Sequence, residues 1–446
     1  MARTGLTQLP PPAATGTLVS QALTLTEQYR EVRAATLALC SPLAVEDYVV
    51  QSMPDASPAK WHLAHTTWFF EEFVLQHSRG GYDFHDGEFR YLFNSYYNAV
   101  GPMHTRSNRG LLSRPTVQQV LDYRARIDER MQALLAAAGG IPAGLTQIIV
   151  LGLHHEQQHQ ELLLTDIKHL FSCNPLLPAY VSPPAPPARA APALSYRYFA
   201  GGLVDIGYEQ QRAQHAADAF CFDNELPRHR AYVAPFELAT RLVTNAEYLE
   251  FILDEGYQNA AHWLSDGWAT VQREQWTRPI YWSDSLREEF TLRGLVELDP
   301  HAPVCHLSCY EADAFARWAG ARLPTEFEWE IAATGIPTSG NFVEGRQWHP
   351  LPAAHPAPAP QTEAPPMLQM FGDAWEWTQS AYAPYPGYRP ASGALGEYNG
   401  KFMVNQLVLR GGSCATPYSH IRPTYRNFFN PAARWQFSGV RLARDL

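Results

Sequence analysis

Residues 153–164 read LHHEQQHQELLL and carry the most informative spacing in this chain of 446 residues. On a helix, His155 and His159 are about 40° apart, so both imidazole rings project from one face and can chelate one divalent metal ion. His154 lies about 140° from His159, and Glu161 lies about 200° beyond it. His154 is therefore a poor partner, and Glu161 cannot complete the same site from this helix, so any third ligand must come from elsewhere.

The pattern around this motif predicts a helix over residues 144–171. Residues 116–137 repeat apolar side chains at the 3.6-residue period of a helix, with a capping box at the start and two consecutive glycines after the end. Similar patterns cover residues 18–40 and 58–78. Four helices of this length predict an antiparallel bundle, a fold that often holds metal ions between its helices.

A proline-rich stretch divides the chain into two parts. Residues 175–194, PLLPAYVSPPAPPARAAPAL, have the composition of a semi-rigid linker and cannot form the core of a helix or sheet. We therefore expect a helical domain over residues 18–174, preceded by a disordered lead-in over residues 1–17. A second domain is expected over residues 195–446, because a chain of this length favours two domains.

The second part of the chain has a different character. Glycines, tryptophans and short apolar runs dominate it, and the apolar spacing from Tyr310 to Trp318 indicates one helix. A second proline-rich stretch, residues 349–366, is short enough to be a surface loop. These features predict an irregular α+β domain with many loops, a setting in which binding residues often lie.

The composition excludes several classes of protein. The formal net charge of −10 argues against a nucleic-acid-binding surface, which needs a basic face. No run of about 18 apolar residues is present to span a membrane, and the N-terminus lacks the apolar core of a signal peptide. The six cysteines form no CxxC pair and no disulfide framework. We therefore expect a cytoplasmic protein without a nucleic-acid or membrane partner.

The histidine motif has a competing interpretation. Residues 155–159 also read HExxH, the signature of zinc metalloproteases, with Glu156 as the general base. The longer HExxHxxGxxH form is absent, and no glutamate that could serve as a third ligand follows until the chain has crossed the linker. The sequence therefore disfavours a protease.

The segment KWHLAHTTWFFEEF offers a better third ligand. His62 and His65 lie three residues apart on a predicted helix that is rich in aromatic residues, and either could face the interior of the bundle. The spacing alone does not choose between them.

Together these motifs resemble a known family. WHLAHTTWFFE and HHEQQHQE are similar to the DinB-like four-helix domain of the sulfoxide synthases of ergothioneine biosynthesis, commonly called EgtB. The second part resembles the formylglycine-generating-enzyme fold, related to C-type lectins, in FDNELPRH, LATRLVTNAEYLEF, RLPTEFEWEIAA, FGDAWEWTQS, LRGGSCATP and RWQFSGVRLAR. The resemblance runs from about residue 20 to the C-terminus. It implies a multi-domain α and α+β protein, with a DinB-like four-helix bundle followed by a C-type-lectin-like α+β domain.

The resemblance also implies an iron enzyme. In the family three histidines hold Fe(II), and the matching residues here are His65, His155 and His159, while His62 would support the iron site. Three neutral imidazoles leave positions open for a substrate imidazole, a sulfur atom and O2. Gln158, directly before the last ligand, would position the substrate ring. The implied reaction joins hercynine to a sulfur donor, cysteine, and gives hercynylcysteine sulfoxide.

The segment NSYYNAVGPMHTRSNRG contains a second group of candidate residues. Arg106 and Arg109 are three residues apart beside a Gly-Pro turn, and such a pair can bind a carboxylate with two hydrogen bonds. Related synthases place an R-x-x-R pair here to hold the carboxylate of the sulfur donor. Tyr96 and Tyr97 resemble the paired tyrosines of the cysteine-using branch. A tyrosine near reacting oxygen can supply a proton, so both are candidate catalytic residues.

The C-terminal segment departs from one branch of the family. Synthases that take γ-glutamylcysteine carry Asn-Trp-Asp where this chain has Asn427, Phe428 and Phe429. Loss of the aspartate removes a polar partner for an amine-bearing donor and leaves an aromatic face suited to a quaternary ammonium group. Asn427 is the candidate contact for one end of the substrate, and the two phenylalanines either contact the substrate or fill the core. Cys414 has no clear second thiol, which argues against the copper chemistry of formylglycine-generating enzymes.

Three alternatives remain open at this point. Related enzymes join hercynine to a selenosugar on the way to selenoneine, and nothing in the sequence excludes that donor. Others use unmethylated histidine and make 5-histidylcysteine sulfoxide, but they carry a further methyltransferase domain. The third alternative is a non-catalytic lectin-like binding module, which would hold no iron.

Overall fold

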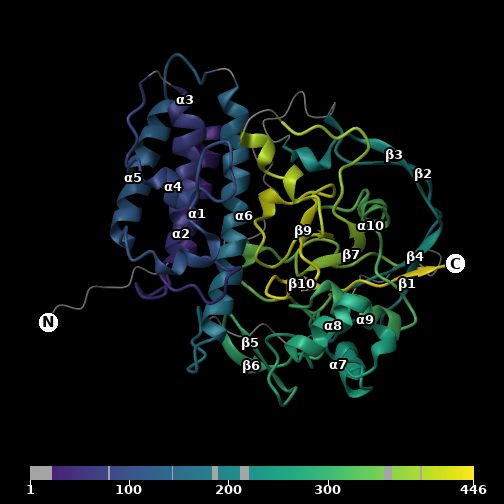
Figure 1. The fold of residues 1–446 in the computed structure, drawn as a ribbon. Helices are drawn as coiled ribbons and strands as arrows, with labels where there is room; N and C mark the ends of the chain where they lie inside the picture. Colours follow the sequence, from purple (N-terminus) through teal and green to yellow (C-terminus); the bar gives the residue numbers. More distant parts are fainter. Residues whose placement is uncertain are drawn as a thin grey trace.

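The computed structural model describes residues 23–78, 81–142, 144–182, 189–210, 220–355, 364–391 and 394–446. A helical body formed by the N-terminal part of the chain stands beside an α+β body formed by the rest (Figure 1). The predicted fold class is thereby confirmed. The lead-in predicted over residues 1–17 lies outside the described residues, as does the centre of the predicted linker, residues 183–188. The exact domain boundaries stay predictions.

Four long helices form the helical body: α1 (Leu25–Cys40), α2 (Ala59–Phe70), α5 (Val117–Leu135) and α6 (Leu145–Ser172). α2 continues through a π-helical turn, η1 (Glu71–Leu75), into the short α3 (Gln76–Ser78). The connection from α3 to α5 contains α4 (Phe89–Phe93) and a 3-10 turn, η2 (Arg106–Leu111). α1 and α5 each begin with a capping box, and the one on α5 was predicted. In each, the threonine side chain accepts the backbone N–H of the residue three positions later, and the side chain of that glutamate or glutamine accepts the backbone N–H of the threonine.

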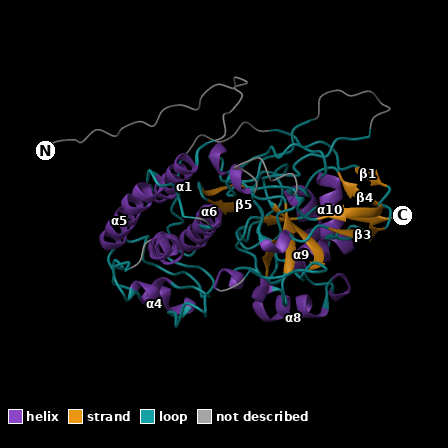
Figure 2. Cartoon of the chain, turned by 90° about the horizontal axis from the view of Figure 1, so that it is seen from above, coloured by secondary structure: helices purple, strands orange, loops and turns teal. Residues whose placement is uncertain are grey.

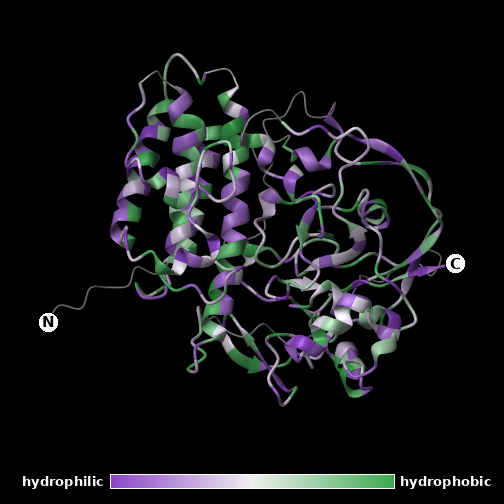
Figure 3. Cartoon of the chain, viewed as in Figure 1, coloured by the Kyte–Doolittle hydropathy of each residue, from purple (hydrophilic) through white to green (hydrophobic). Residues whose placement is uncertain are grey.

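α2 lies at the centre of the bundle. All of its residues are buried, as expected for a helix with apolar and aromatic side chains on every face, and it packs against α5 and α6. α5 carries both hydrophilic and hydrophobic residues, which fits a helix with one exposed face (Figure 3), whereas α6 is exposed only in its first turn. Within the described ranges, no helix is long and apolar enough to cross a membrane.

Two sheets organise the α+β body. In the first, β1 (Tyr196–Phe199) and β11 (Ala443–Asp445) flank β4 (Phe236–Ala239) in antiparallel pairing, so the first and last strands of the α+β body belong to one sheet. Figure 2 shows β1 and β4 at the end of the molecule remote from α5. The second sheet has the order β10 (Ser438–Gly439), β7 (Trp375–Ala381), β8 (Leu407–Arg410) and β9 (Asn427–Phe429). Two hairpins stand apart: β2 (Gly202–Ile206) with β3 (His229–Val233), and β5 (Glu288–Thr291) with β6 (Gly294–Glu297).

The α+β body contains more helix than the sequence interpretation predicted. The predicted helix is present as α9 (Cys309–Trp318), but α7 (Asn245–Leu253), α8 (Ser265–Glu274) and α10 (Glu326–Ala333) were not expected. Thr244 and Thr325 each form a capping box with a glutamate three residues later. That short signature marks the starts of α7 and α10, although both helices are too short to show a clear apolar period.

α6 is the element that joins the two bodies. The carboxylate of Glu161 accepts hydrogen bonds from Trp375 Nε1 at 2.7 Å, Ser413 Oγ at 2.5 Å and Thr416 Oγ1 at 3.0 Å. Because the donors belong to the α+β body, one face of α6 is fixed against it. The opposite face carries two of the candidate metal ligands into the bundle.

Candidate metal centre

Three histidines converge where α2 faces α6. His65 projects from α2, and His155 and His159 project from α6 at the predicted spacing. The three ligand nitrogens lie within 4.8 Å of one another, and Nε2 of His65 is 3.1 Å from Nε2 of His155. Across the described parts of the chain, no other group of three histidine, cysteine or carboxylate side chains is arranged to hold a metal ion.

The hydrogen bonds around these rings test whether a metal ion fits. Nδ1 of His65 lies 2.6 Å from the carbonyl oxygen of Phe93, which can only accept, so Nδ1 holds the proton and Nε2 is bare. Burial lowers the pKa of His65 well below its usual value and that of His155 to about 3, so both rings are neutral. The 3.1 Å between their Nε2 atoms is close to the spacing of two nitrogens bound at about 2.1 Å and nearly at a right angle to one ion. The residues fit a metal ion.

The competing third ligand, His62, does not belong to this group of three. Its ring contacts His159 and Asp166 instead, and it is buried between α2 and α6. From the sequence spacing, His62 and His65 were equally good candidates for the third ligand. The packing of α2 against α6 places only His65 in the group of three.

Glu156 is not placed to act as the base of a protease. Its carboxylate is buried and accepts hydrogen bonds from Arg33 at 2.8 Å, Arg124 at 2.5 Å and Thr36 at 2.6 Å. These two guanidinium groups outweigh the effect of burial and lower the pKa of Glu156 to about 2. A carboxylate held this tightly in ion pairs between α1, α5 and α6 has a structural role, so the protease interpretation is wrong.

Gln158 lies at the boundary between the two bodies. Its Nε2 donates to the Tyr425 hydroxyl at 2.6 Å, and its Oε1 accepts from the Tyr398 hydroxyl. The Tyr425 hydroxyl also lies 3.0 Å from Nε2 of His420, whose Nδ1 is 2.9 Å from Nδ1 of His154. The candidate substrate-positioning amide is therefore anchored by side chains of the α+β body.

Tyr398 was missed by the sequence interpretation. Its ring lies 5.6 Å from the ring of His155 and 5.4 Å from Phe222, and the side chain is buried. It comes from a loop, GEYNGKF, that has no periodic pattern. The only local feature that could have drawn attention to it is its place beside Asn399 between two glycines. That feature does not indicate which residues the loop contacts.

Tyr96 and Tyr97 stack on each other, with ring centroids 4.5 Å apart and hydroxyls 3.4 Å apart. Trp68 contacts both Tyr97, at 5.7 Å, and His65, at 5.5 Å. Burial raises the pKa of both tyrosines, so both phenols keep their protons at neutral pH. The tyrosine pair is therefore linked to the histidines through the indole ring of Trp68, which contacts both Tyr97 and His65.

The two arginines lie in different surroundings. The guanidinium of Arg109 is buried, lies 3.4 Å from the ring centre of Trp61, and donates to Ser57 Oγ at 2.9 Å and Ser95 Oγ at 3.0 Å. Its Nε has no hydrogen-bond partner, and burial with the charge of Arg106 lowers the pKa of Arg109 to about 8. Arg106 is exposed and donates to the carbonyl oxygen of Asp55. Arg109 is therefore the buried cation that would gain most from an incoming carboxylate.

The predicted C-terminal contacts lie on β9. The Phe428 ring stacks on Tyr382 at 4.0 Å and lies 6.0 Å from Phe402, which in turn contacts Tyr96 at 5.3 Å. The Phe429 ring instead contacts Trp435, and the side chain of Asn427 accepts the backbone N–H of Phe428. Phe428 thus belongs to an aromatic group that reaches the bundle, while Phe429 packs within the α+β body.

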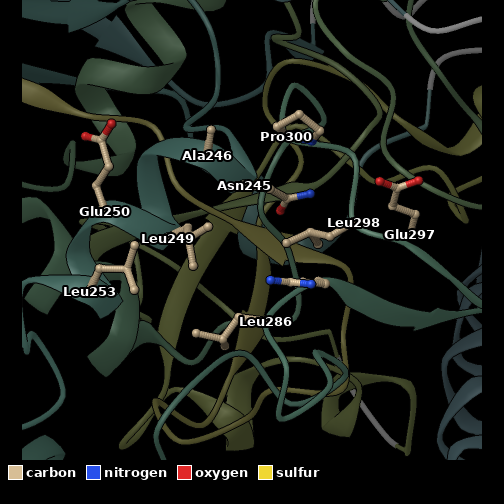
Figure 4. A pocket seen from close by; sticks show the side chains of 10 residues that line it. Asn245, Ala246, Leu249, Glu250, Leu253, Leu286, Glu297, Leu298 and Pro300 are labelled. Carbon is tan, nitrogen blue, oxygen red and sulfur yellow. The ribbon is translucent and has the colours of Figure 1, made fainter.

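Two pockets among those on the described surface differ in their relation to the histidines. The larger, of about 770 Å³, lies between the first turns of α6 and the α+β body and is lined by Leu151, Phe222 and Tyr398 among others. The smaller, of about 480 Å³, lies on α7 and the β5–β6 hairpin, where leucines face its middle and two glutamates stand at opposite sides (Figure 4). Because it contains none of the candidate residues, only the larger pocket is connected with the histidines, through Tyr398.

Comparison with known proteins assigns the chain to a family. The profile of the sulfatase-modifying factor enzyme 1-like domain (FGE-sulfatase) matches residues 198–446, and that of the DinB superfamily (DinB_2) matches residues 28–163. Hercynine oxygenase of Mycobacterium tuberculosis is 34% identical over 412 residues, covering 88% of this chain and 92% of the relative. Hercynine oxygenase of Mycolicibacterium thermoresistibile is 33% identical and covers 97% of both chains. This chain belongs to the hercynine oxygenase family.

The hercynine oxygenase assignment rests on the whole chain and not on one domain. Formylglycine-generating enzyme of Streptomyces coelicolor is 28% identical, but the match covers only 59% of this chain. The two hercynine oxygenases above also span the helical bundle that carries the three histidines. The predicted resemblance to the sulfoxide synthases of ergothioneine biosynthesis is therefore confirmed.

Proposed function

We propose that the protein is a non-haem Fe(II) enzyme that uses O2 to join C2 of the hercynine imidazole to the sulfur of cysteine, giving hercynylcysteine sulfoxide. The observation that carries the proposal is a group of three converging histidines close to a buried arginine without a carboxylate partner among the described residues. Membership of the hercynine oxygenase family supports the substrate and the oxidoreductase class.

His65, His155 and His159 would hold the iron, because neutral imidazoles suit Fe(II) and leave positions open for substrates. The bound iron supplies the oxygen chemistry, and the protein supplies binding, orientation and a site protected from water. Gln158 would offer its amide to the substrate ring, because it precedes His159 on α6 and is fixed by Tyr425.

Arg109 would bind the carboxylate of the donor. A buried guanidinium that donates only to two serine hydroxyls gains a charge-assisted hydrogen bond when an anion arrives. This favours cysteine over a selenosugar, which would leave Arg109 without a carboxylate. Arg106 points to the Asp55 carbonyl and would have to turn to share the same anion.

The aromatic group around Phe428 would receive the trimethylammonium end of hercynine. Phe428 stacks on Tyr382 and lies beside Phe402, and the outer ring faces of such a group attract quaternary ammonium groups. Unmethylated histidine would gain less from this surface. Tyr97 and Tyr96 would supply the proton consumed when oxygen is reduced, with Tyr398 as a third phenol close to His155.

The test is a competition assay on the purified enzyme loaded with Fe(II) in air. Hercynine is supplied with cysteine, γ-glutamylcysteine and a selenosugar in one reaction, and the products are identified by mass. A cysteine adduct of hercynine with one additional oxygen is expected. A selenium adduct without added oxygen would move the enzyme to selenoneine synthesis, and no adduct from an iron-loaded enzyme would refute the proposed substrate.

A further inference from the structure

His62 and Asp166 form a hydrogen-bonded pair behind one of the three histidines. Nε2 of His62 lies 3.0 Å from Oδ2 of Asp166, and Nδ1 of His62 lies 2.8 Å from Nδ1 of His159. Both side chains are nearly inaccessible to solvent, with exposed fractions of 2% for His62 and 6% for Asp166. Water therefore does not compete for these contacts.

The direction of each hydrogen bond follows from the carboxylate. Asp166 can only accept when ionised, so Nε2 of His62 must carry a proton. A neutral His62 then has a bare Nδ1, which can only accept, so Nδ1 of His159 must donate to it. The remaining nitrogen of His159, Nε2, is left without a proton, which is the form that a metal ion requires.

The three histidines differ in what stands behind them. Nδ1 of His65 donates to an uncharged carbonyl oxygen, at Phe93. Nδ1 of His155 has no hydrogen-bond partner among the described residues. Among the hydrogen bonds of the described residues, only those of His159 lead, through His62, to a carboxylate. A negative charge behind an imidazole increases the electron density that the ring can donate to a metal.

Asp166 has a second neighbour of functional interest. Its Oδ2 accepts the backbone N–H of Ser57 at 2.8 Å, and the hydroxyl of the same serine accepts from Arg109 at 2.9 Å. The negative charge of Asp166 also acts on Arg109 and favours its charged form. One carboxylate therefore stands behind a candidate metal ligand and close to the candidate donor-binding arginine.

We propose that Asp166 and His62 form a relay that fixes the tautomer of His159 and makes His159 the strongest electron donor of the three ligands. His62 is a positioning residue in this scheme, because it acts through His159 and does not touch the metal. The proposal rests on the metal site proposed above but not on the identity of the substrates.

The test measures metal affinity and reduction potential without substrate. His62→Phe removes the acceptor, whereas His62→Gln can accept from His159 through its oxygen and donate to Asp166 through its nitrogen. We expect His62→Phe to weaken Fe(II) binding about 10- to 100-fold and to raise the Fe(III)/Fe(II) potential. His62→Gln should restore most of the affinity. Competition with a chromophoric chelator and redox titration give the two quantities.

Two further variants separate charge from packing. Asp166→Asn keeps the shape but removes the charge, so it should raise the potential even where the metal still binds. His169→Gln, on the same helix but bonded to Ser52, is the matched control and should leave both quantities unchanged. The relay is refuted if His62→Phe matches wild type, or if His62→Gln fails as badly as His62→Phe. If His62→Phe does not fold, as judged by circular dichroism, the test rests on the reduction potentials of the other two variants. The relay then requires a raised potential in Asp166→Asn and a potential close to wild type in His62→Gln. Wild-type protein that binds no Fe(II) would instead refute the proposed metal site.

Discussion

At the scale of single residues, burial separates side chains that look alike in the sequence. Arg106 and Arg109 belong to one R-x-x-R pair, yet one is exposed and the other is enclosed by Trp61, Ser57 and Ser95. A buried cation with unused hydrogen-bonding capacity is costly unless an anion completes it. The structure therefore assigns unequal importance to two residues of the same type.

The arginines give the first prediction. Arg109→Ala should weaken binding of cysteine about 10- to 100-fold, because a hydrogen bond to a charged group contributes about 1.5–3 kcal/mol, and should change hercynine binding little. Arg106→Ala, the matched control, should change both by less than about fivefold, since an exposed pair contributes at most about 1 kcal/mol. Steady-state KM values for each substrate provide the measurement. Equal losses for cysteine and hercynine in Arg109→Ala would contradict the role given to Arg109.

At the scale of elements, α2 and α6 must approach closely for the histidines to meet. Gly152 lies one turn before His155 on α6, and a Cβ atom there would come within 2.8 Å of ring carbons of Phe69 and Phe70 on α2. Such contacts are shorter than real side chains tolerate, so the two rings or the helices that carry them would have to shift. The glycine is required by the approach of the helices and not by its backbone conformation.

Gly152→Ala should therefore disturb the metal centre from a distance. We expect a loss of about 1–3 kcal/mol in the free energy of unfolding, since overpacking outweighs the better helix propensity of alanine. Fe(II) affinity should fall as well. Thermal melting of the metal-free protein and chelator competition measure the two effects. Gly139→Ala, where nothing lies within 4 Å, is the control, and an equal response of both variants would exclude the packing argument.

The ion pairs of Glu156 join three helices and make the stability of the bundle depend on pH. Arg124 and Arg33 lower the folded-state pKa of Glu156 to about 2 from its ordinary 4.5. A lowered carboxyl pKa stabilises the fold above pH 4.5, and this contribution is lost as the pH falls toward 2. A shift of this size corresponds to about 3 kcal/mol.

Glu156→Gln should remove this dependence and destabilise the protein at neutral pH by about 3–5 kcal/mol, because two buried guanidinium groups lose their partner. Urea unfolding at pH 7, 4.5 and 3 would measure both the loss of stability and the loss of pH dependence. The wild type should weaken markedly between pH 4.5 and 3, whereas the variant should change less over that interval. Parallel pH profiles would show that other carboxylates dominate acid unfolding.

At the scale of the whole molecule, two of the three candidate metal ligands and the contacts with the α+β body share one helix, α6. Glu161 lies two residues after His159 and accepts three hydrogen bonds from the α+β body. Gln158, between the two faces, bonds to Tyr398 and Tyr425. Assembly of the complete centre therefore requires the two bodies to be docked, because the helical bundle alone supplies the histidines but not these tyrosines.

Glu161→Ala should loosen this docking. Three buried donors would lose their acceptor, at a cost of about 1–3 kcal/mol each before relaxation. We expect calorimetry to show two separated transitions in place of one, with Fe(II) binding retained and turnover reduced. Glu344→Ala, at an exposed carboxylate that accepts the Tyr418 N–H within the α+β body, is a control that should keep one transition. A single transition with normal turnover in Glu161→Ala would contradict the coupling.

The sequence by itself determined the helical bundle, the α+β part and the pair His155–His159, because each depends on spacing along one element. The capping box at Thr116 and the i,i+4 histidines are local features, so local physics was sufficient. The family resemblance supplied His65. Packing between distant segments decided the rest: it placed His62 behind His159, buried Arg109 but not Arg106, and brought Tyr398 from an aperiodic loop to Gln158. Contacts between distant segments depend on the direction of side chains after packing, and no one-dimensional pattern contains that information.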